Sequence, residues 1–194
     1  FLREHAKSTG TEFVPFDQHA DYGSFVDGKP RLDGTKAFLE SRGIELPEGS
    51  PDDPPGQPTV YGLSNRKNAL VLAKLAADGV QVYEGSIAYI RAVREKGIAT
   101  AIVSSSANTE QVLDSAGIAG LFDVRVDGQV AAQRGLQGKP APDTFLAAAQ
   151  ELNVPPSHAA VFEDALAGVA AGHAGGFALV VGVDRVGQAQ ALHE

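Results

Sequence analysis

Residues 159–172 read AAVFEDALAGVAAG, and this stretch decides the fold. Its first four residues are apolar and favour a short buried strand. The acidic pair Glu163 and Asp164 follows where that strand ends. Positions 166, 169, 170 and 173 then follow the i, i+3, i+4 and i+7 spacing of one helix face. We therefore predict that Glu163 and Asp164 lie at the carboxyl edge of an α/β sheet, where ligands bind.

The acidic pair also indicates a metal site. Two adjacent carboxylates repel each other unless a cation or a proton lies between them, and Mg²⁺ prefers carboxylate and other oxygen ligands. The alternative is that Asp164 is only the N-cap of the following helix. That alternative leaves Glu163 without a role.

The composition is that of an ordinary globular protein. Hydrophobic residues make up 43% of the chain and charged residues 21%, with a net charge of -8 from interspersed acids and bases. This balance argues against nucleic acid or an anionic membrane as the main partner, but it allows a small anionic substrate. The chain has no membrane-spanning apolar run, no signal peptide and no cysteine, so we exclude thiol catalysis and expect a cytoplasmic protein.

The chain divides into a helical first part and an α/β second part. A helix is expected to end at Gly10, a second to follow the loop 28–31, and a third to span 65–78, with a proline-rich loop at 49–58. From residue 83 onward, strands and helices alternate, which predicts a parallel sheet with right-handed crossovers. The strands are expected at 98–103, 122–126, 159–162 and 177–183, and the helices at 86–96, 109–116, 142–152 and 164–173.

Two more segments carry polar groups to the predicted sheet edge. Residues 104–106 are three serines after a strand, and Asn108 is expected to cap the next helix, with Gln111 completing a variant capping box. Hydroxyls and free N–H groups at a helix start bind anions, most often phosphate. The alternative is a simple polar turn.

The second segment is GKPAPD, residues 138–143. Pro140 and Pro142 hold Lys139 on a constrained loop before a helix, outside the core, where its ammonium can neutralise phosphoryl oxygens. The alternative is a solvated lysine in a turn.

Together the three segments resemble motifs two, three and four of the haloacid dehalogenase superfamily of phosphotransferases, and they are most similar to its β-phosphoglucomutase-like branch. The matching stretches are VSSSAN at 103–108, GKPAPD at 138–143 and FEDALAGV at 162–169. The resemblance implies a Rossmann-like parallel-sheet α/β core at 83–194 with a helical cap domain at 1–82.

The resemblance also implies a role for each matching residue. Ser104 would hold the transferring phosphoryl group, and Lys139 would bridge that group and the nucleophile. Asp164 would ligate Mg²⁺, with Glu163 ligating the ion or ordering its waters. The substrate-binding residues that it implies are Ser105, Ser106 and Asn108 from the core and Arg31 and Lys67 from the cap. For Arg31 and Lys67 the alternative is that they are solvated surface cations.

One motif of the family is missing. The first motif, Asp-x-Asp on the first core strand, supplies the nucleophile and a general acid/base, and no such motif precedes the cap here. We expect it upstream of Phe1, together with the central strand of the sheet. Residues 1–194 alone are then expected to be inactive and poorly soluble or partly unfolded. Their sheet is expected to show either a strand-wide gap or a strand from another segment in its place.

The favoured hypothesis is Mg²⁺-dependent phosphoryl transfer on a small phosphorylated sugar through an aspartyl-phosphate, converting β-glucose 1-phosphate to glucose 6-phosphate in a monomeric enzyme. One alternative is a sugar-phosphate phosphatase on the same scaffold. Another is a non-catalytic protein that binds phosphorylated metabolites. The intact set of Ser104, Lys139, Glu163 and Asp164 favours an enzyme.

Overall fold

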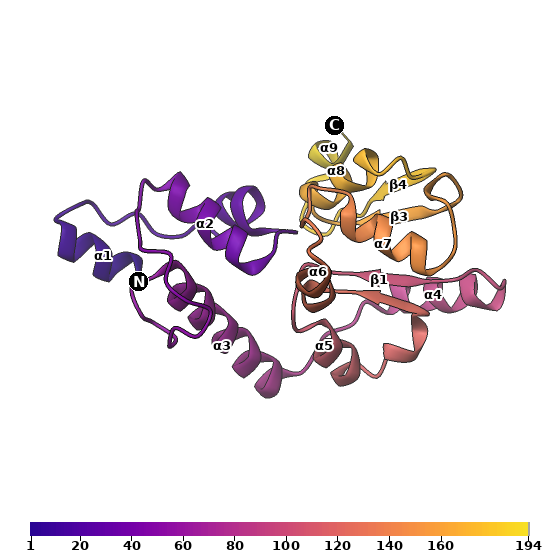
Figure 1. The fold of residues 1–194 in the computed structure, drawn as a ribbon, viewed down its shortest axis with the longest axis horizontal. Coiled ribbons are helices and arrows are strands. Elements are labelled where there is room, and N and C mark those ends of the chain that lie inside the picture. Colours follow the sequence, from indigo (N-terminus) through magenta and orange to yellow (C-terminus); the bar gives the residue numbers. More distant parts are fainter. Residues whose placement is uncertain (194) are drawn as a thin grey trace.

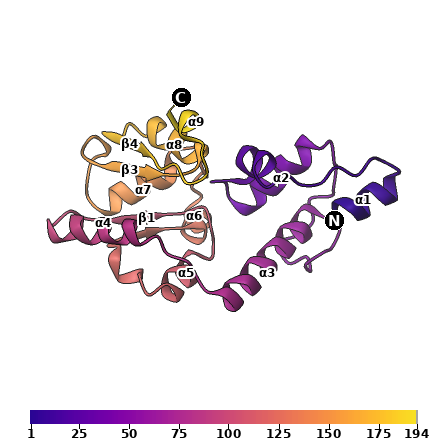
Figure 2. The ribbon, with the colours of Figure 1, turned by 180° about the vertical axis from the view of Figure 1, so that it is seen from behind.

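The computed structural model describes residues 1–193, which form two lobes (Figure 1). The helical lobe contains residues 1–78, and the α/β lobe contains residues 84–193. Figure 2 shows from behind that the lobes lie side by side and that a loop of the helical lobe reaches across to the α/β lobe. Among the described residues, no helix has the length and apolar character needed to cross a bilayer.

The helical lobe is built from α1 (Leu2–Thr9), the π-helical turn η1 (Tyr22–Val26), α2 (Arg31–Ser41) and α3 (Val60–Asp78). Helix α1 ends at Gly10 as predicted, because that glycine adopts the left-handed conformation with φ 70°. Helix α3 begins at Val60 rather than at Asn65, since the Thr59 hydroxyl accepts a hydrogen bond from the Gly62 N–H at 2.9 Å and caps the helix.

The α/β lobe alternates helices and strands as the sequence predicts. Its helices are α4 (Glu84–Glu95), α5 (Thr109–Ser115), α6 (Gly128–Arg134), α7 (Asp143–Glu151), α8 (Leu166–Ala174) and α9 (Ala189–His193). Two 3₁₀ turns, η2 (Ala119–Leu121) and η3 (Pro156–His158), precede β2 and β3. The strands are β1 (Ala101–Val103), β2 (Val124–Val126), β3 (Ala160–Glu163) and β4 (Leu179–Gly182).

The strands form two separate parallel pairs. Strand β1 pairs with β2, with Ala101 opposite Val124, and β3 pairs with β4, with Ala160 opposite Leu179. Among the described residues no ladder joins one pair to the other. The sheet is therefore interrupted between β1 and β3, which agrees with the expectation of a gap.

Helix α7 packs across the interruption. Its residues Ala147 and Ala148 pack with Val126 in one core cluster, and its Phe145 packs with Val161 and Ala171 in a second. Val103 at the end of β1 contacts both clusters. A single helix thus holds the two strand pairs in one lobe, with the carboxyl ends of their strands close to each other.

Several predicted boundaries are wrong, and the reasons are local. Strand β1 starts at Ala101 rather than at Ile98, because Thr100 donates its N–H and its hydroxyl to Asp123 and Leu121 instead of joining the ladder. Helix α8 starts after Ala165, so Asp164 is not its N-cap. Helix α6 was not predicted at all. The Asp127 carboxylate begins it by accepting hydrogen bonds from the N–H groups of residues 129 and 130, each at 3.0 Å.

Candidate active site

The acidic pair, the serine loop and the lysine loop converge where the strands end. The serine loop leaves β1 at Ser104, whose N–H donates to the Val126 carbonyl at the end of β2. Glu163 is the last residue of β3, and its carbonyl accepts from Val183 just beyond β4. Lys139 approaches from the loop before α7. The predicted core residues therefore come from three different segments that share one edge.

Lys139 and Glu163 form a buried ion pair. The Lys139 Nζ lies 2.8 Å from Glu163 Oε2, and the two side chains are only 4% and 10% exposed. The same ammonium lies 4.7 Å from the centre of the Phe145 ring on α7. Burial raises the pKa of the Glu163 carboxyl, and the nearby Lys139 charge opposes that rise. The expectation that Lys139 lies outside the core is wrong, because α7 and Glu163 together enclose it.

Asp164, in contrast, is half exposed and faces a different cation. The Arg185 Nε donates to Asp164 Oδ2 at 2.8 Å, and the Arg185 guanidinium lies 3.9 Å from the centre of the Tyr83 ring. The side-chain amide of Gln188 donates to the Asp164 backbone carbonyl at 2.7 Å. Among the described residues, no hydrogen bond uses Asp164 Oδ1. One carboxylate oxygen is thus held in place while the other is available.

The donor chemistry at this edge fits Mg²⁺. The ion usually takes one or two protein carboxylates and completes its octahedron with water and substrate phosphate oxygens. Asp164 supplies a free carboxylate oxygen, whereas Glu163 is engaged by Lys139. The described residues contain no group of three or more His, Cys, Asp or Glu side chains that could hold a metal ion by themselves. Any ion here would therefore depend on further oxygens.

The three serine hydroxyls have three different partners. The Ser104 hydroxyl accepts from the Ser106 N–H at 3.2 Å, and the Ser106 hydroxyl accepts from the Asn108 N–H at 3.1 Å. The Ser105 hydroxyl instead donates to the Gly28 carbonyl of the helical lobe at 2.6 Å. The loop is therefore an ordered turn, and one of its hydroxyls crosses to the other lobe.

Asn108 does not cap α5 with its side chain, so the predicted capping box is absent. Its amide donates to Asn68 Oδ1 on α3 at 2.8 Å, which is a second side-chain contact between the lobes. The contact with α3 replaces the local contact that the sequence suggested.

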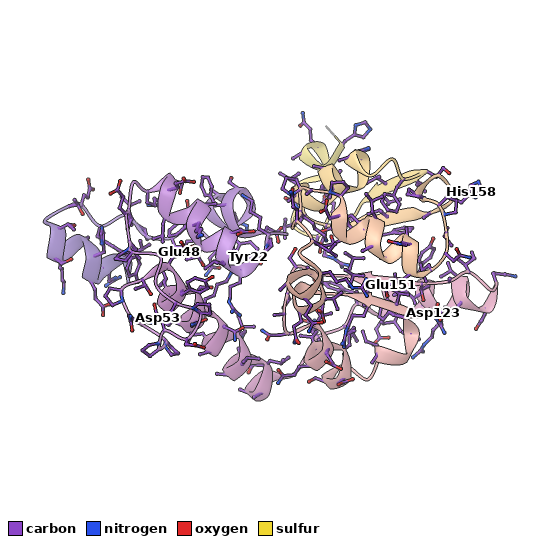
Figure 3. All side chains as sticks on the ribbon, viewed as in Figure 1. Tyr22, Glu48, Asp53, Asp123, Glu151 and His158 are labelled. Carbon is purple, nitrogen blue, oxygen red and sulfur yellow. The ribbon has the colours of Figure 1, made fainter. Side chains whose placement is uncertain are left out.

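The predicted cations of the helical lobe lie near one another. The Arg31 Nε donates to the Ser64 hydroxyl at 3.1 Å. The Lys67 Nζ lies 5.9 Å from the centre of the Tyr22 ring, and Tyr22 lies on the side of its lobe that faces the α/β lobe (Figure 3). Burial lowers the pKa of Arg31, and burial together with the Arg31 charge lowers the pKa of Lys67. Both side chains are thus partly desolvated, unlike ordinary surface cations.

Asp27 connects these cations with the core. It is partly buried, and burial raises the pKa of its carboxyl, as does the charge of Asp164. The charges of Lys139 and Lys67 act in the opposite direction. The carboxylate of Asp27 therefore lies within electrostatic reach of charged groups from both lobes.

The sequence reasoning missed three site residues, which are Asp27, Asn68 and Arg185. Arg185 follows the end of β4, so the rule that strand ends share an edge could have placed it there. For Asp27 and Asn68 the chain offers no comparable local signal, because their position depends on how the lobes meet.

Comparisons with known proteins agree on one family. The sequence profile described as haloacid dehalogenase-like hydrolase matches residues 8–176. The chain is 55% identical over 189 residues to the β-phosphoglucomutase of Mycobacterium bovis, an alignment that covers 97% of this chain and 72% of that protein.

Solved structures show the same fold. The β-phosphoglucomutase of Clostridium difficile superposes with a TM-score of 0.69 at 22% identity, covering 92% of this chain and 74% of that one. CbbY from Rhodobacter sphaeroides, crystallised with xylulose-(1,5)bisphosphate, superposes with a TM-score of 0.66 at 23% identity and covers 94% of this chain and 77% of that one. The predicted fold class, a Rossmann-like parallel-sheet core with a helical cap, is confirmed.

Proposed function

We propose, because this chain belongs to the haloacid dehalogenase-like hydrolase family, that its sheet edge transfers a phosphoryl group on a small sugar phosphate. The protein is an enzyme of the phosphotransferase and hydrolase type. The favoured reaction is the conversion of β-glucose 1-phosphate to glucose 6-phosphate. The name of the Mycobacterium bovis relative supports this choice.

The observation that carries the proposal is the buried pair of Lys139 and Glu163 beside the serine loop. A buried ammonium is costly unless it is compensated, and Glu163 compensates it at 2.8 Å. The same ammonium offers a fixed positive charge to phosphoryl oxygens, which gain negative charge in the transition state. In this proposal Lys139 stabilises that charge, and Glu163 holds Lys139 in position.

Ser104 and Asp164 complete the core side of the proposed site. The Ser104 hydroxyl accepts a local hydrogen bond, so its proton is available to a phosphoryl oxygen. Asp164 would hold Mg²⁺ through Oδ1, with Glu163 next to the ion's waters. When bound, the ion would neutralise phosphoryl oxygens and orient the transferring group.

The remaining residues would bind the sugar phosphate. Ser106 and Asn108 would hold its distal phosphate, together with Arg31 and Lys67 from the helical lobe, which acts as the cap. Partial burial supports this role for both cations, because a desolvated cation attracts phosphate more strongly than an exposed one. The hydroxyl of Ser105 is engaged by Gly28, so any contact of Ser105 with substrate would come from its backbone.

None of these residues takes the role of the nucleophile in the proposal. An aspartyl-phosphate needs a carboxylate directed at phosphorus, whereas Glu163 pairs with Lys139, and no Asp-x-Asp motif occurs in the sequence. The proposal therefore assigns charge stabilisation, metal binding and substrate binding to these residues.

A panel of sugar monophosphates tests the proposal. The full-length protein is assayed with Mg²⁺ for both the isomerised sugar phosphate and free inorganic phosphate. Ser104→Ala should lower kcat/KM by about tenfold to a thousandfold, as expected when one preorganised contact to the transition state is lost. Normal turnover by Ser104→Ala would contradict the proposed site.

The second candidate function is hydrolysis of the same substrates. The exposed position of Asp164 favours this candidate, because a half-exposed site admits water more readily than an enclosed one. Free phosphate as the dominant product from β-glucose 1-phosphate would place the protein among the phosphatases.

A further inference from the structure

The two lobes meet most closely at residues 28–30 of the helical lobe. The Gly28 carbonyl accepts the hydrogen bond from Ser105 at 2.6 Å. Gly28 has φ +69°, and a Cβ at this position would lie 2.8 Å from the Ala165 Cβ and 3.4 Å from the Ala167 Cβ. Only glycine fits here without displacing the loop that carries Asp164.

The lysine loop also approaches the helical lobe closely, at Pro30. A Cβ built on Gly138 would lie 2.8 Å from the Pro30 Cδ. The segment 28–30 is therefore enclosed by the serine loop, the lysine loop and the acidic loop, which together carry all of the predicted core residues. The segment 28–30 of the helical lobe is thus seated against the three loops that carry the proposed site.

We infer that the Ser105 hydroxyl is a latch that holds the cap closed and so determines how often the phosphoryl group goes to the sugar rather than to water. The claim that Ser105 holds the cap closed rests on its hydrogen bond with Gly28. The claim that closure changes the product ratio rests on the proposed function. Ser105 is a positioning residue, since it acts through the cap and does not contact the reacting atoms.

The side-chain hydrogen bonds across this contact are the interactions that a single substitution can remove. Charges act across it in both directions, because Asp27 lies within electrostatic reach of Asp164, which repels its carboxylate, and of Lys139, which attracts it. Two side-chain hydrogen bonds between the lobes are described above, and both come from residues that the sequence predicts to bind substrate. Asn108 keeps that role in the proposed binding scheme, whereas the Ser105 hydroxyl is engaged by the Gly28 carbonyl and takes no part in that scheme.

One neutral hydrogen bond sets the scale of the effect. Its loss should shift the ratio of closed to open molecules by about 2- to 10-fold. Since water enters the open site, the ratio of free phosphate to isomerised sugar phosphate should rise by a similar factor.

The test compares Ser105→Ala with Ser41→Ala in the full-length protein. The Ser41 hydroxyl also donates to a backbone carbonyl, that of Phe38 at 2.7 Å, but within one lobe, so its loss is a matched control. Because this chain has no native cysteine, dyes can be placed at Glu40→Cys and Gln150→Cys, two exposed positions in different lobes. Single-molecule energy transfer between the dyes then reports the closed fraction.

We expect Ser105→Ala to lower the ratio of closed to open molecules by about 2- to 10-fold. Ser41→Ala should leave this ratio unchanged. Gly28→Ala should open the cap further, since its Cβ meets Ala165. A wild-type distance distribution in Ser105→Ala would overturn the latch, whatever reaction the protein catalyses. An open cap in Ser105→Ala with an unchanged product ratio would overturn its catalytic consequence. If the wild-type protein showed no turnover, the proposed function would be contradicted. The distance measurement would still show whether Ser105 holds the cap closed.

Discussion

Replacing Lys139 by alanine should destabilise the protein as well as slow it. The change leaves the Glu163 carboxylate, whose side chain is only 10% exposed, without its ion-pair partner. Removing one partner of a buried ion pair costs about 3 to 5 kcal/mol. The loss in the free energy of unfolding has an upper limit, because Glu163 can take up a proton and so avoid a buried, unpaired charge. Protonating a carboxyl with the ordinary pKa of 4.5 at pH 7 costs about 3.4 kcal/mol. We therefore expect a loss of roughly 3 kcal/mol in the free energy of unfolding at pH 7.

The same reasoning predicts how the stability of Lys139→Ala depends on pH. Burial already raises the folded-state pKa of Glu163, and removing Lys139 removes the charge that opposes this rise. The folded variant then binds a proton more tightly than the unfolded chain does. Its stability deficit should be largest at neutral pH and should shrink as the pH falls through the raised folded-state pKa toward 4.5, the ordinary value.

Urea denaturation of Lys139→Ala between pH 4.5 and pH 8 measures this effect. Lys74→Ala serves as the matched control, because it breaks an ion pair with Asp78 whose side chains are 78% and 60% exposed, and it should leave the stability unchanged. A double variant, Lys139→Met with Glu163→Gln, removes both charges and should recover most of the lost stability. Wild-type stability of Lys139→Ala at pH 7, or a deficit that does not vary with pH, would refute the reasoning.

Variants at three further positions test other parts of the account. Asp164→Ala should bind Mg²⁺ at least about tenfold more weakly in calorimetric titration, because it removes the free carboxylate oxygen, and equal binding would contradict the metal assignment. Arg31→Ala should lower the formation of glucose 6-phosphate more than the release of phosphate, whereas equal losses would deny Arg31 a role in holding the second phosphate. Asp127→Ala should lower the free energy of unfolding by about 1 to 2 kcal/mol in thermal denaturation, because it removes the cap of α6. Asp127→Asn should lose less stability, because asparagine can still cap the helix, and equal losses would show that the cap is not the cause.

The sequence predicts those features that depend on local patterns. Alternating apolar segments and helix stop signals indicate the order of strands and helices, and the rule on strand ends places Ser104, Glu163 and Asp164 at one edge. Helix α6 escapes prediction because it is only seven residues long and its start depends on one carboxylate, that of Asp127.

The features that could not be predicted depend on contacts between distant segments. Lys139 reads as a loop residue, and its burial follows from the packing of α7 and from the approach of Glu163. Asn108 reads as a helix cap, but its amide contacts Asn68 on the other lobe. No periodicity or spacing encodes how the two lobes meet, so the role of Gly28 becomes visible only in three dimensions.

The most direct test of the central claim is phosphorus NMR of the full-length protein with β-glucose 1-phosphate and Mg²⁺, following glucose 6-phosphate and inorganic phosphate in one time course. The account predicts that glucose 6-phosphate forms faster than inorganic phosphate is released, and that Asp164→Ala and Ser104→Ala slow both. Consumption that yields mainly inorganic phosphate would contradict the transferase assignment. No consumption of this or any related sugar phosphate would contradict the proposed site itself.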